Sequence, residues 1–441
     1  MPRAGSTIVP LAVRVLIATI GSAGDVHPFL GVAEELRRRG HEVAMLVNPH
    51  FEARVRALGI EYFPLGTEDD LLRVLHSPRL ANQRQSPYLV IEALFNNSIE
   101  PSYAAMQEAV KAWKPDAILR HHIFPTARWV GEEHKIPVYT AVLAPAMLFA
   151  PSEPMIFRSH MPVWFQKALS RPLKTAGKYA MRWYVDRPVN QVRAKLGLAP
   201  MRDVLYRESH EGTRVLGLWS RHYRGPREDD PKQSQICGYC FFDRARGDKD
   251  AVLEPALERF LGKAEERGRP AIVFTLGTTI VHHAREFYEI AVRACREIDR
   301  PCVLLTGKDE AGPASARGAE DVCVVNYAAH SLVMPRCAAS VHHAGAGSAS
   351  QAMRSGKPSV AVPFVNDEFD IAHRMENLGV SAYLPASKLA RVERGARSLA
   401  TALSEVTTNP AFANRARELG QLIRVENGAA TAAAAIESSI G

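Results

Sequence analysis

The sequence has few cysteines, no long uncharged apolar run and no general excess of basic residues. Six cysteines in 441 residues are too few for a disulfide framework, and Cys237-Gly-Tyr-Cys240 lacks the second pair that a zinc site needs. No stretch of about 18–20 uncharged apolar residues occurs, so no membrane span is predicted. Pro10 and Arg14 interrupt the apolar start, which favours a buried first strand over a signal peptide. A cytoplasmic protein is expected.

The net positive charge of the chain lies in one segment. The formal net charge is +8. Between Arg158 and Arg207 there are 11 Lys/Arg against Asp186 and Asp203, so this segment carries +9 and the rest of the chain sums to −1. Its predicted helix, 163–195, mixes aromatic residues with Lys and Arg. Two interpretations stay open: peripheral contact with an anionic membrane at its inner face, or a solvated basic face over an apolar core.

Composition and length predict an ordinary globular protein of two or three domains. Hydrophobic residues make up 46% of the chain and charged residues 23%, which excludes a disordered protein. The first 150 residues alternate apolar strand patterns with helix patterns, the order typical of a doubly wound α/β domain. Strands are predicted at 13–19, 42–47, 61–64, 117–119 and 138–142, and helices at 28–39, 51–58 and 126–134.

The same alternation starts again near Arg269, after a middle part rich in Pro, Arg and aromatic residues. The fold class is therefore α/β, with two Rossmann-like doubly wound domains facing a cleft. We predict an N-terminal domain over 1–237, a linker over 238–250, a C-terminal domain over 251–425 and a terminal helix over 426–441.

A Gly-rich segment, 341–349, follows a predicted strand and opens a predicted helix. Small residues let the backbone approach a ligand, and free amides at a helix N-terminus bind anions. The segment matches neither a P-loop nor a dinucleotide-binding fingerprint. A tight strand-to-helix turn that binds no ligand is therefore the alternative to an anion site. Further on, Asp367 and Glu368 follow another strand, where carboxylates accept hydrogen bonds from sugar hydroxyls. For Asp370 a solvated helix cap is favoured.

Several motifs in order resemble the family 1 glycosyltransferases of the GT-B fold, and they span most of the chain. Residues 342–348 and 363–368 resemble the family's donor motif, and residues 326–330 resemble its base-stacking segment. Residues 274–279 resemble the loop after the first strand of its C-terminal domain, and residues 20–28 resemble its first N-terminal turn. Within the family the resemblance is greatest to the rhamnosyltransferase subunits of rhamnolipid biosynthesis and to related bacterial natural-product and sterol glycosyltransferases.

The resemblance implies an inverting hexosyltransferase that uses a UDP- or dTDP-linked sugar and an apolar small-molecule or lipid acceptor with a free hydroxyl. Asp25 is the expected general base and His27 the second choice, with capping of a helix as the structural alternative for Asp25. Ser22 and His122 are expected on the acceptor side. The expected donor-binding residues are Gly277, Thr278, Thr279, Tyr327, His330, His342, Gly345, Ala346, Gly347, Ser348, Asp367 and Glu368.

The chain departs from the family pattern at several of these positions. Ala344 replaces a glycine and is expected to narrow the phosphate site slightly, and Glu368 replaces a glutamine. No metal site and no cofactor are expected, because the helix N-terminus would stabilise the diphosphate and the nucleotide sugar is a co-substrate. Two other functions were weighed: a nucleotide-sugar epimerase or hydrolase on the same fold, and a non-catalytic binding protein. Nucleic acid is not an expected partner, since no nucleic-acid-binding pattern occurs.

Overall fold

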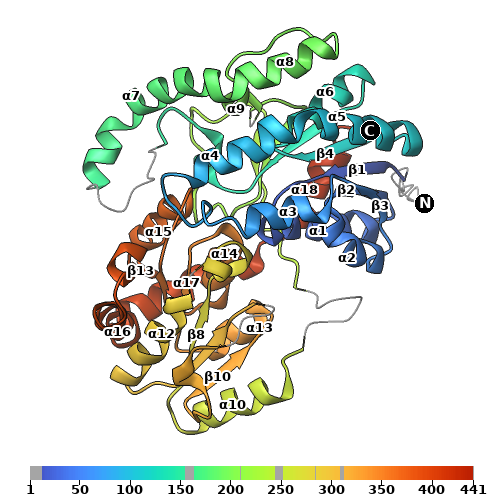
Figure 1. Cartoon of the computed structure of the whole chain (residues 1–441). Coiled ribbons are helices and arrows are strands. Elements are labelled where there is room, and N and C mark those ends of the chain that lie inside the picture. Colours follow the sequence, from blue (N-terminus) through green and yellow to red (C-terminus); the bar gives the residue numbers. More distant parts are fainter. Residues whose placement is uncertain are drawn as a thin grey trace, which may run out of the picture.

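The chain forms two parallel β-sheets flanked by helices (Figure 1). The computed structural model describes residues 12–153, 163–208, 210–243, 252–283, 285–307 and 312–440. In β1 (Arg14–Ala18), alternate residues serve two separate cores. Val15 and Ile17 pack with one set of helices, and Leu16 and Ala18 with another. Burial of both faces explains why this strand reads as an uninterrupted apolar run.

The N-terminal sheet has the strand order β3-β2-β1-β4-β5-β6-β7, and all its pairings are parallel. Its remaining strands are β2 (Glu42–Val47), β3 (Glu61–Pro64), β4 (Ala117–His121), β5 (Val138–Val142), β6 (Arg214–Gly217) and β7 (Ser234–Ile236). The C-terminal sheet has the order β10-β9-β8-β11-β12-β13. Its strands are β8 (Ile272–Thr275), β9 (Cys302–Leu305), β10 (Val322–Val325), β11 (Ala339–His342), β12 (Ser359–Ala361) and β13 (Ser381–Tyr383). This topology confirms the predicted pair of doubly wound α/β units.

The helices that matter for the site come from both units. In the N-terminal unit they are α1 (Ala23–Arg38), α2 (Glu52–Ala57), α3 (Glu68–Leu75), α4 (Ser86–Ile91), the π-helix η2 (Glu92–Asn97), α5 (Ile99–Trp113), α6 (Pro125–Glu133), α7 (Val163–Met181), the π-helix η4 (Arg182–Asp186), α8 (Arg187–Lys195) and α9 (Val204–Glu208). In the C-terminal unit they are α10 (Pro255–Glu266), α11 (Gly277–Ile280), α12 (Arg285–Glu297), α13 (His330–Val333), α14 (Ala346–Ser355), α15 (Glu368–Asn377), α16 (Val392–Thr408) and α17 (Pro410–Val425).

The last helix, α18 (Gly428–Glu437), returns to the N-terminal sheet and lies beside α1 (Figure 1). Glu437 pairs with Arg39 at 2.7 Å and with His41 at 2.7 Å. The Tyr139 hydroxyl donates to the carbonyl of Ile436 at 3.1 Å. The end of the chain is thereby packed into the core of the first domain, and the two domains are joined at a second place besides the predicted linker. Most of that linker, 244–250, lies outside the described residues.

Two local predictions differ from the structure. Helix α1 begins at Ala23, five residues before the predicted start, because Ser22 and Asp25 cap its first turn and the helix continues through Pro28. The segment between β3 and β4, for which no element was predicted, holds α3, α4 and α5. The predicted helix at 163–195 is confirmed, as α7, η4 and α8 follow one another without a break.

Buried ion pairs link the two units near the cleft. Glu153 accepts from Arg224 at 3.0 Å and pairs with Arg374 of α15. Arg374 also pairs with Asp370 at 2.6 Å. Asp370 is buried, so the predicted solvated cap is wrong: this carboxylate serves the contact between the domains. Within the described part of the chain, no helix is long and apolar enough to cross a bilayer.

Candidate active site

A cavity of about 1680 Å³ lies between the two sheets. It is lined by residues that follow the carboxyl ends of β1 and β4 in the first unit and of β8, β10, β11 and β12 in the second. In each sheet the strand order reverses at one place, between β1 and β4 and between β8 and β11. Ligands of doubly wound folds bind outside the carboxyl ends of the strands at such switch points. The cavity therefore joins both binding positions of the fold.

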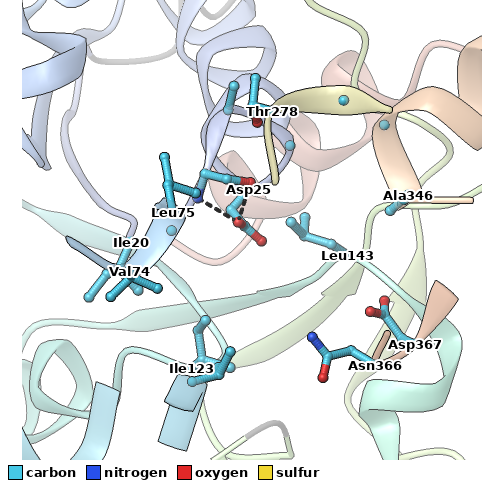
Figure 2. A pocket seen from close by; sticks show the side chains of 18 of the residues that line it. Ile20, Asp25, Val74, Leu75, Ile123, Leu143, Thr278, Ala346, Asn366 and Asp367 are labelled. Carbon is cyan, nitrogen blue, oxygen red and sulfur yellow. Dashed lines mark hydrogen bonds between the residues drawn. The ribbon is translucent and has the colours of Figure 1, made fainter. Parts of the chain in front are cut away.

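Asp25 projects into this cavity from the first turn of α1 (Figure 2). Its Oδ2 accepts from the backbone N–H of Ser22 at 2.8 Å and from the Ser22 hydroxyl at 3.0 Å. Gly21, at φ +116°, precedes this turn, and a Cβ there would overlap Oδ2. Burial raises the pKa of Asp25, and the two Ser22 hydrogen bonds oppose that rise. One carboxylate oxygen thus caps the helix, and Oδ1 remains for a ligand.

His121, the last residue of β4, faces the other oxygen of Asp25. Its Nε2 lies 3.7 Å from Asp25 Oδ1. Its Nδ1 accepts from the backbone N–H of Ile123 at 3.2 Å, which places the ring proton on Nε2, the nitrogen toward Asp25. Burial, together with His122 and Arg120, lowers the pKa of His121 well below its usual range, so the ring is neutral. His122 stacks on it at 4.5 Å and also lines the cavity.

His27 lines the cavity two residues beyond Asp25. The guanidinium of Arg54 donates to its Nε2. Burial and the charge of Arg54 lower the pKa of His27 to about 3. A neutral imidazole whose basic nitrogen already accepts a hydrogen bond from a cation is a poor proton acceptor.

The opposite wall of the cavity is the N-terminus of α14. Gly345, Ala346, Gly347 and Ser348 all line the cavity, and the helix begins at Ala346 (Figure 2). The first amides of a helix lack intrahelical acceptors and carry partial positive charge. Gly277 and Thr278, which follow β8, lie on the same wall. The side chain of Thr279 lies outside the described part of the structure.

The structure differs from the prediction at the two histidines before α14. His342 does not line the cavity: its ring is buried, and Nδ1 accepts from the backbone N–H of Ala344 at 3.1 Å. His343 lines the cavity instead, and burial lowers its pKa to about 3. The methyl group of Ala344 packs in the domain core, so the expected narrowing of the phosphate site is wrong.

The ring of His343 takes the space next to two glycines. A Cβ at Gly345 would overlap its Nε2, and a Cβ at Gly277 would lie 2.5 Å from its Cε1. Both positions therefore require glycine while the ring is in place. Gly277 also has φ +62°, a conformation that favours glycine.

Tyr327 and His330 follow β10 and line the same end of the cavity. The Tyr327 ring is 58% exposed, so one face is free to stack on a planar ligand. Burial lowers the pKa of His330 to about 4, which keeps its imidazole neutral near pH 7.

Asp367 and Glu368 enter the cavity after β12 (Figure 2 shows Asp367 near Asn366). Glu368 Oε2 accepts from the backbone N–H groups of Phe364 at 2.7 Å and Val365 at 2.9 Å. Burial raises the pKa of Asp367 to about 6 and that of Glu368 to about 8. Near pH 7 the Glu368 carboxyl group is thus protonated and donates as well as accepts, as a glutamine does.

We expect Glu368→Gln to weaken the dependence of stability on pH. The folded chain keeps the Glu368 proton up to about pH 8, whereas the unfolded chain releases it near pH 4.5. Between these values the folded state binds more protons, so its stability falls as pH rises. At pH 8.5 the variant should exceed the wild type by up to about 4 kcal/mol in unfolding free energy, and near pH 4.5 the two should agree. Urea unfolding across this range measures the difference.

The exposed Glu405 of α16 offers a matched control, because Glu405→Gln changes the same group outside the cavity. Its unfolding curve should follow that of the wild type at every pH. Equal pH dependence of Glu368→Gln and the wild type would show that Glu368 is ionised in the folded chain.

The part of the cavity beyond Asp25 is mostly apolar, although charged residues such as Arg73, Arg79 and Glu92 also line it. Its lining comes from α3, α4, η2, the turn after β5 and α7. Representative side chains are Val74, Leu75, Leu89, Phe95, Met147 and Leu169. Among the described residues, no group of three or more His, Cys, Asp or Glu lies together as a metal site would require. Metal independence stays a prediction.

Sequence reasoning selected His122 and His342 but not their neighbours His121 and His343. At 342–343 the alternation of the strand decides which ring faces the cavity, and the strand end was not predicted to one residue. It also missed the helices that form the apolar part, since the segment between β3 and β4 carried no prediction. Of the predicted residues with described side chains, the cavity brings together all except His342.

Comparison with known proteins gives two family matches that divide the chain. Residues 15–148 match the glycosyltransferase family 28 N-terminal domain. Residues 291–433 match the erythromycin biosynthesis protein CIII-like C-terminal domain. The two matched regions carry the two walls of the cavity.

Similar whole proteins include the O-mycaminosyltylonolide 6-deoxyallosyltransferase of Streptomyces fradiae, 30% identical over 96% of this chain and 97% of that protein. A sterol 3-beta-glucosyltransferase of Arabidopsis thaliana is 25% identical over 95% of this chain and 67% of its own length. A sterol 3-beta-glucosyltransferase of Komagataella phaffii is 26% identical over 95% of this chain, which spans 34% of that longer protein.

Solved structures share the fold. The glycotransferase of kitacinnamycin superposes with a TM-score of 0.71 at 21% identity, covering 98% of this chain and 100% of its own. The calicheamicin glycosyltransferase CalG4 gives a TM-score of 0.70 at 19% identity, covering 98% and 99%.

Proposed function

The chain belongs to the family 1 glycosyltransferases of the GT-B fold, and from that premise we propose that it transfers a hexose from a UDP- or dTDP-linked donor to a hydroxyl group of an apolar small molecule or lipid, with inversion at the anomeric carbon. One observation carries the proposal. The carboxylate of Asp25 and the N-terminus of α14 face one cavity from its two sides. A base and an anion site so placed suit a direct displacement between acceptor and donor.

The donor would bind along the C-terminal wall. Its nucleobase stacks on Tyr327, and its diphosphate accepts hydrogen bonds from the amides of Gly347 and Ser348 at the start of α14. His343 and Thr278 lie on the same wall and complete the polar surroundings of the phosphates. Asp367 and Glu368 would accept from or donate to the sugar hydroxyls.

In the transfer step the acceptor oxygen forms a bond to the anomeric carbon while the bond from that carbon to the phosphate oxygen breaks. The acceptor proton passes to Asp25 Oδ1, and the electron pair of the broken bond leaves with the diphosphate. A carboxylate with an ordinary pKa of about 4 is a weak base for an alcohol. The raised pKa of Asp25 makes it a better acceptor of that proton.

His121 would act as a positioning residue for this base. Its Nε2–H points toward Asp25 Oδ1 and favours the ionised carboxylate before the acceptor binds. This arrangement supports Asp25 as the base over His27, whose Nε2 is held by Arg54.

The acceptor would occupy the apolar part of the cavity beside Asp25. The Streptomyces fradiae relative is named for a tylonolide and the plant and yeast relatives for sterols, all large apolar alcohols. The apolar lining from α3, α4, η2 and α7 supports an acceptor of that class.

Incubating the protein with labelled UDP- and dTDP-hexoses, with and without a sterol or macrolide alcohol, tests the proposal. A transferase should consume donor rapidly only when the acceptor is present, and the product should carry the inverted anomeric configuration by NMR. Equal consumption of donor without acceptor would instead identify an epimerase or a hydrolase on this fold.

A further inference from the structure

The outer face of the long helix formed by α7, η4 and α8 carries large aromatic side chains in water. Trp164 is 71% exposed, and Tyr179 and Trp183 are each 64% exposed. Phe165 and Tyr184 are also more than a third exposed. We call these five residues the aromatic face. Soluble proteins seldom expose such side chains together without a partner.

Cations are interleaved with these rings. The guanidinium of Arg182 lies 4.7 Å from the Tyr179 ring, and that of Arg187 lies 4.4 Å from the Trp183 ring. Tyr179, Trp183 and Arg187 are four residues apart along the helix. Lys178 lies next to Tyr179 and is exposed. Aromatic rings with Lys and Arg around them are typical of protein surfaces that lie in the interface of an anionic membrane.

Not every cation of this basic segment is available at the surface. Lys174 is buried, and its ammonium group donates to the carbonyls of Ala150 and Glu153. Arg193 is buried against Trp129. Arg182 is paired with Asp203 at 3.0 Å, and Lys195 with Glu100 at 3.0 Å. Among the described cations of the segment, Lys178 and Arg187 are exposed beside the aromatic face, so they are the ones that a partner would meet there.

The composition of this surface favours one of three possible binding partners: a second copy of the chain, a nucleic acid or a membrane. In a symmetric dimer the same patch would meet itself and bring Lys178 and Arg187 of both copies together, and Asp203, the acid of the patch, is already paired with Arg182. A nucleic acid would neutralise the cations but leave the indole rings of Trp164 and Trp183 without an apolar environment. An anionic bilayer supplies both negative charge and an apolar layer at the depth of the rings.

We propose that the face formed by α7, η4 and α8 binds the surface of membranes that contain anionic phospholipids. In Figure 1 this helix runs along the outside of the N-terminal domain, and only the beginning of α7 comes down toward the C-terminal domain near α15. The opposite side of the same helix contributes Leu169, Gly177 and Met181 to the cavity. An acceptor dissolved in the membrane would therefore be separated from the site by one helix, a consequence that rests on the proposed function. The binding of this face to a membrane does not rest on that function.

Co-sedimentation of the full chain with vesicles tests this proposal. Binding is expected to vesicles of phosphatidylcholine mixed with phosphatidylglycerol, to weaken on adding salt, and to be much weaker to phosphatidylcholine alone. Lys178→Glu/Arg187→Glu should lower the partition coefficient at least about 25-fold, since each cation near such a surface contributes roughly fivefold. Trp164→Ser/Trp183→Ser should lower it about tenfold or more.

Arg394→Glu/Arg397→Glu is the matched control, because it makes the same change of charge and both arginines are exposed on α16 in the other domain. It should bind vesicles as the wild type does, and all variants should keep the thermal midpoint of the wild type. Equal binding of wild type and both face variants would overturn the proposal. A dimer seen by light scattering would also overturn the proposal if the face variants abolished that dimer. Binding to DNA as strong as binding to vesicles would overturn it too, if the same variants abolished the DNA binding.

Discussion

Asp25→Asn is expected to lower kcat by about 10³-fold or more, with donor binding unchanged. A general base contributes about 10²–10⁴-fold, and an amide cannot take the acceptor's proton. Asparagine keeps an oxygen that accepts from Ser22, so the first turn of α1 should stay in place. Turnover of labelled donor in the presence of acceptor measures the loss, and calorimetric titration with the donor or its nucleoside diphosphate measures binding.

The pH dependence of the wild type gives a second readout for the same residue. Because burial raises the pKa of Asp25, the acidic limb of kcat/KM should lie above the ordinary carboxylate range near 4. His121→Leu should move that limb to higher pH, since leucine has no N–H to donate to Oδ1, while leaving donor binding unchanged. Full activity of Asp25→Asn would exclude this carboxylate as the base and leave His27 as the remaining candidate.

Gly345→Ala is expected to weaken donor binding about 100-fold. Its Cβ would overlap Nε2 of His343, and the ring is enclosed by Gly277 on another side, so the loop before α14 must shift. Amides at a helix N-terminus bind a diphosphate only when they converge on it, which makes the loss large. Calorimetric titration with UDP and dTDP measures it directly.

A double-mutant cycle separates the clash from other effects. If the ring is the obstacle, Gly345→Ala should cost little in a His343→Ala background, where the space is open. Gly262→Ala on α10 is the control for the substitution itself, because a Cβ there meets nothing within 4 Å. An equal loss in both backgrounds would show that the clash with His343 is not the cause.

The start of helix α1 and the choice between neighbouring histidines could not be predicted accurately from the sequence. The five strands predicted in the first 150 residues agree with the structure to within two residues at each end, because burial on both faces leaves a short apolar run between turns. The predicted start of α1 is too late, since Pro28 is typical of a first helical turn and the capping considered for Asp25 was that of a helix starting near Pro28, whereas Ser22 and Asp25 cap a helix that begins at Ala23. At 342–343, a shift of one residue at the end of the strand exchanges the side chain that faces the cavity, whereas His121 and His122 both line it.

The sequence by itself determined the fold class, the family and most of the residues around the cavity, because these depend on apolar periodicity and on short segments whose residues act locally. Tertiary structure alone decided the contacts between distant segments: His121 opposite Asp25, His343 between Gly277 and Gly345, Arg54 on His27 and α18 on the first domain. It also divided the cations of the basic segment into buried ones that donate to backbone carbonyls, ones paired with carboxylates and exposed ones beside the aromatic face. Net charge adds over residues, whereas the surface that a partner meets depends on which side of each helix faces the core.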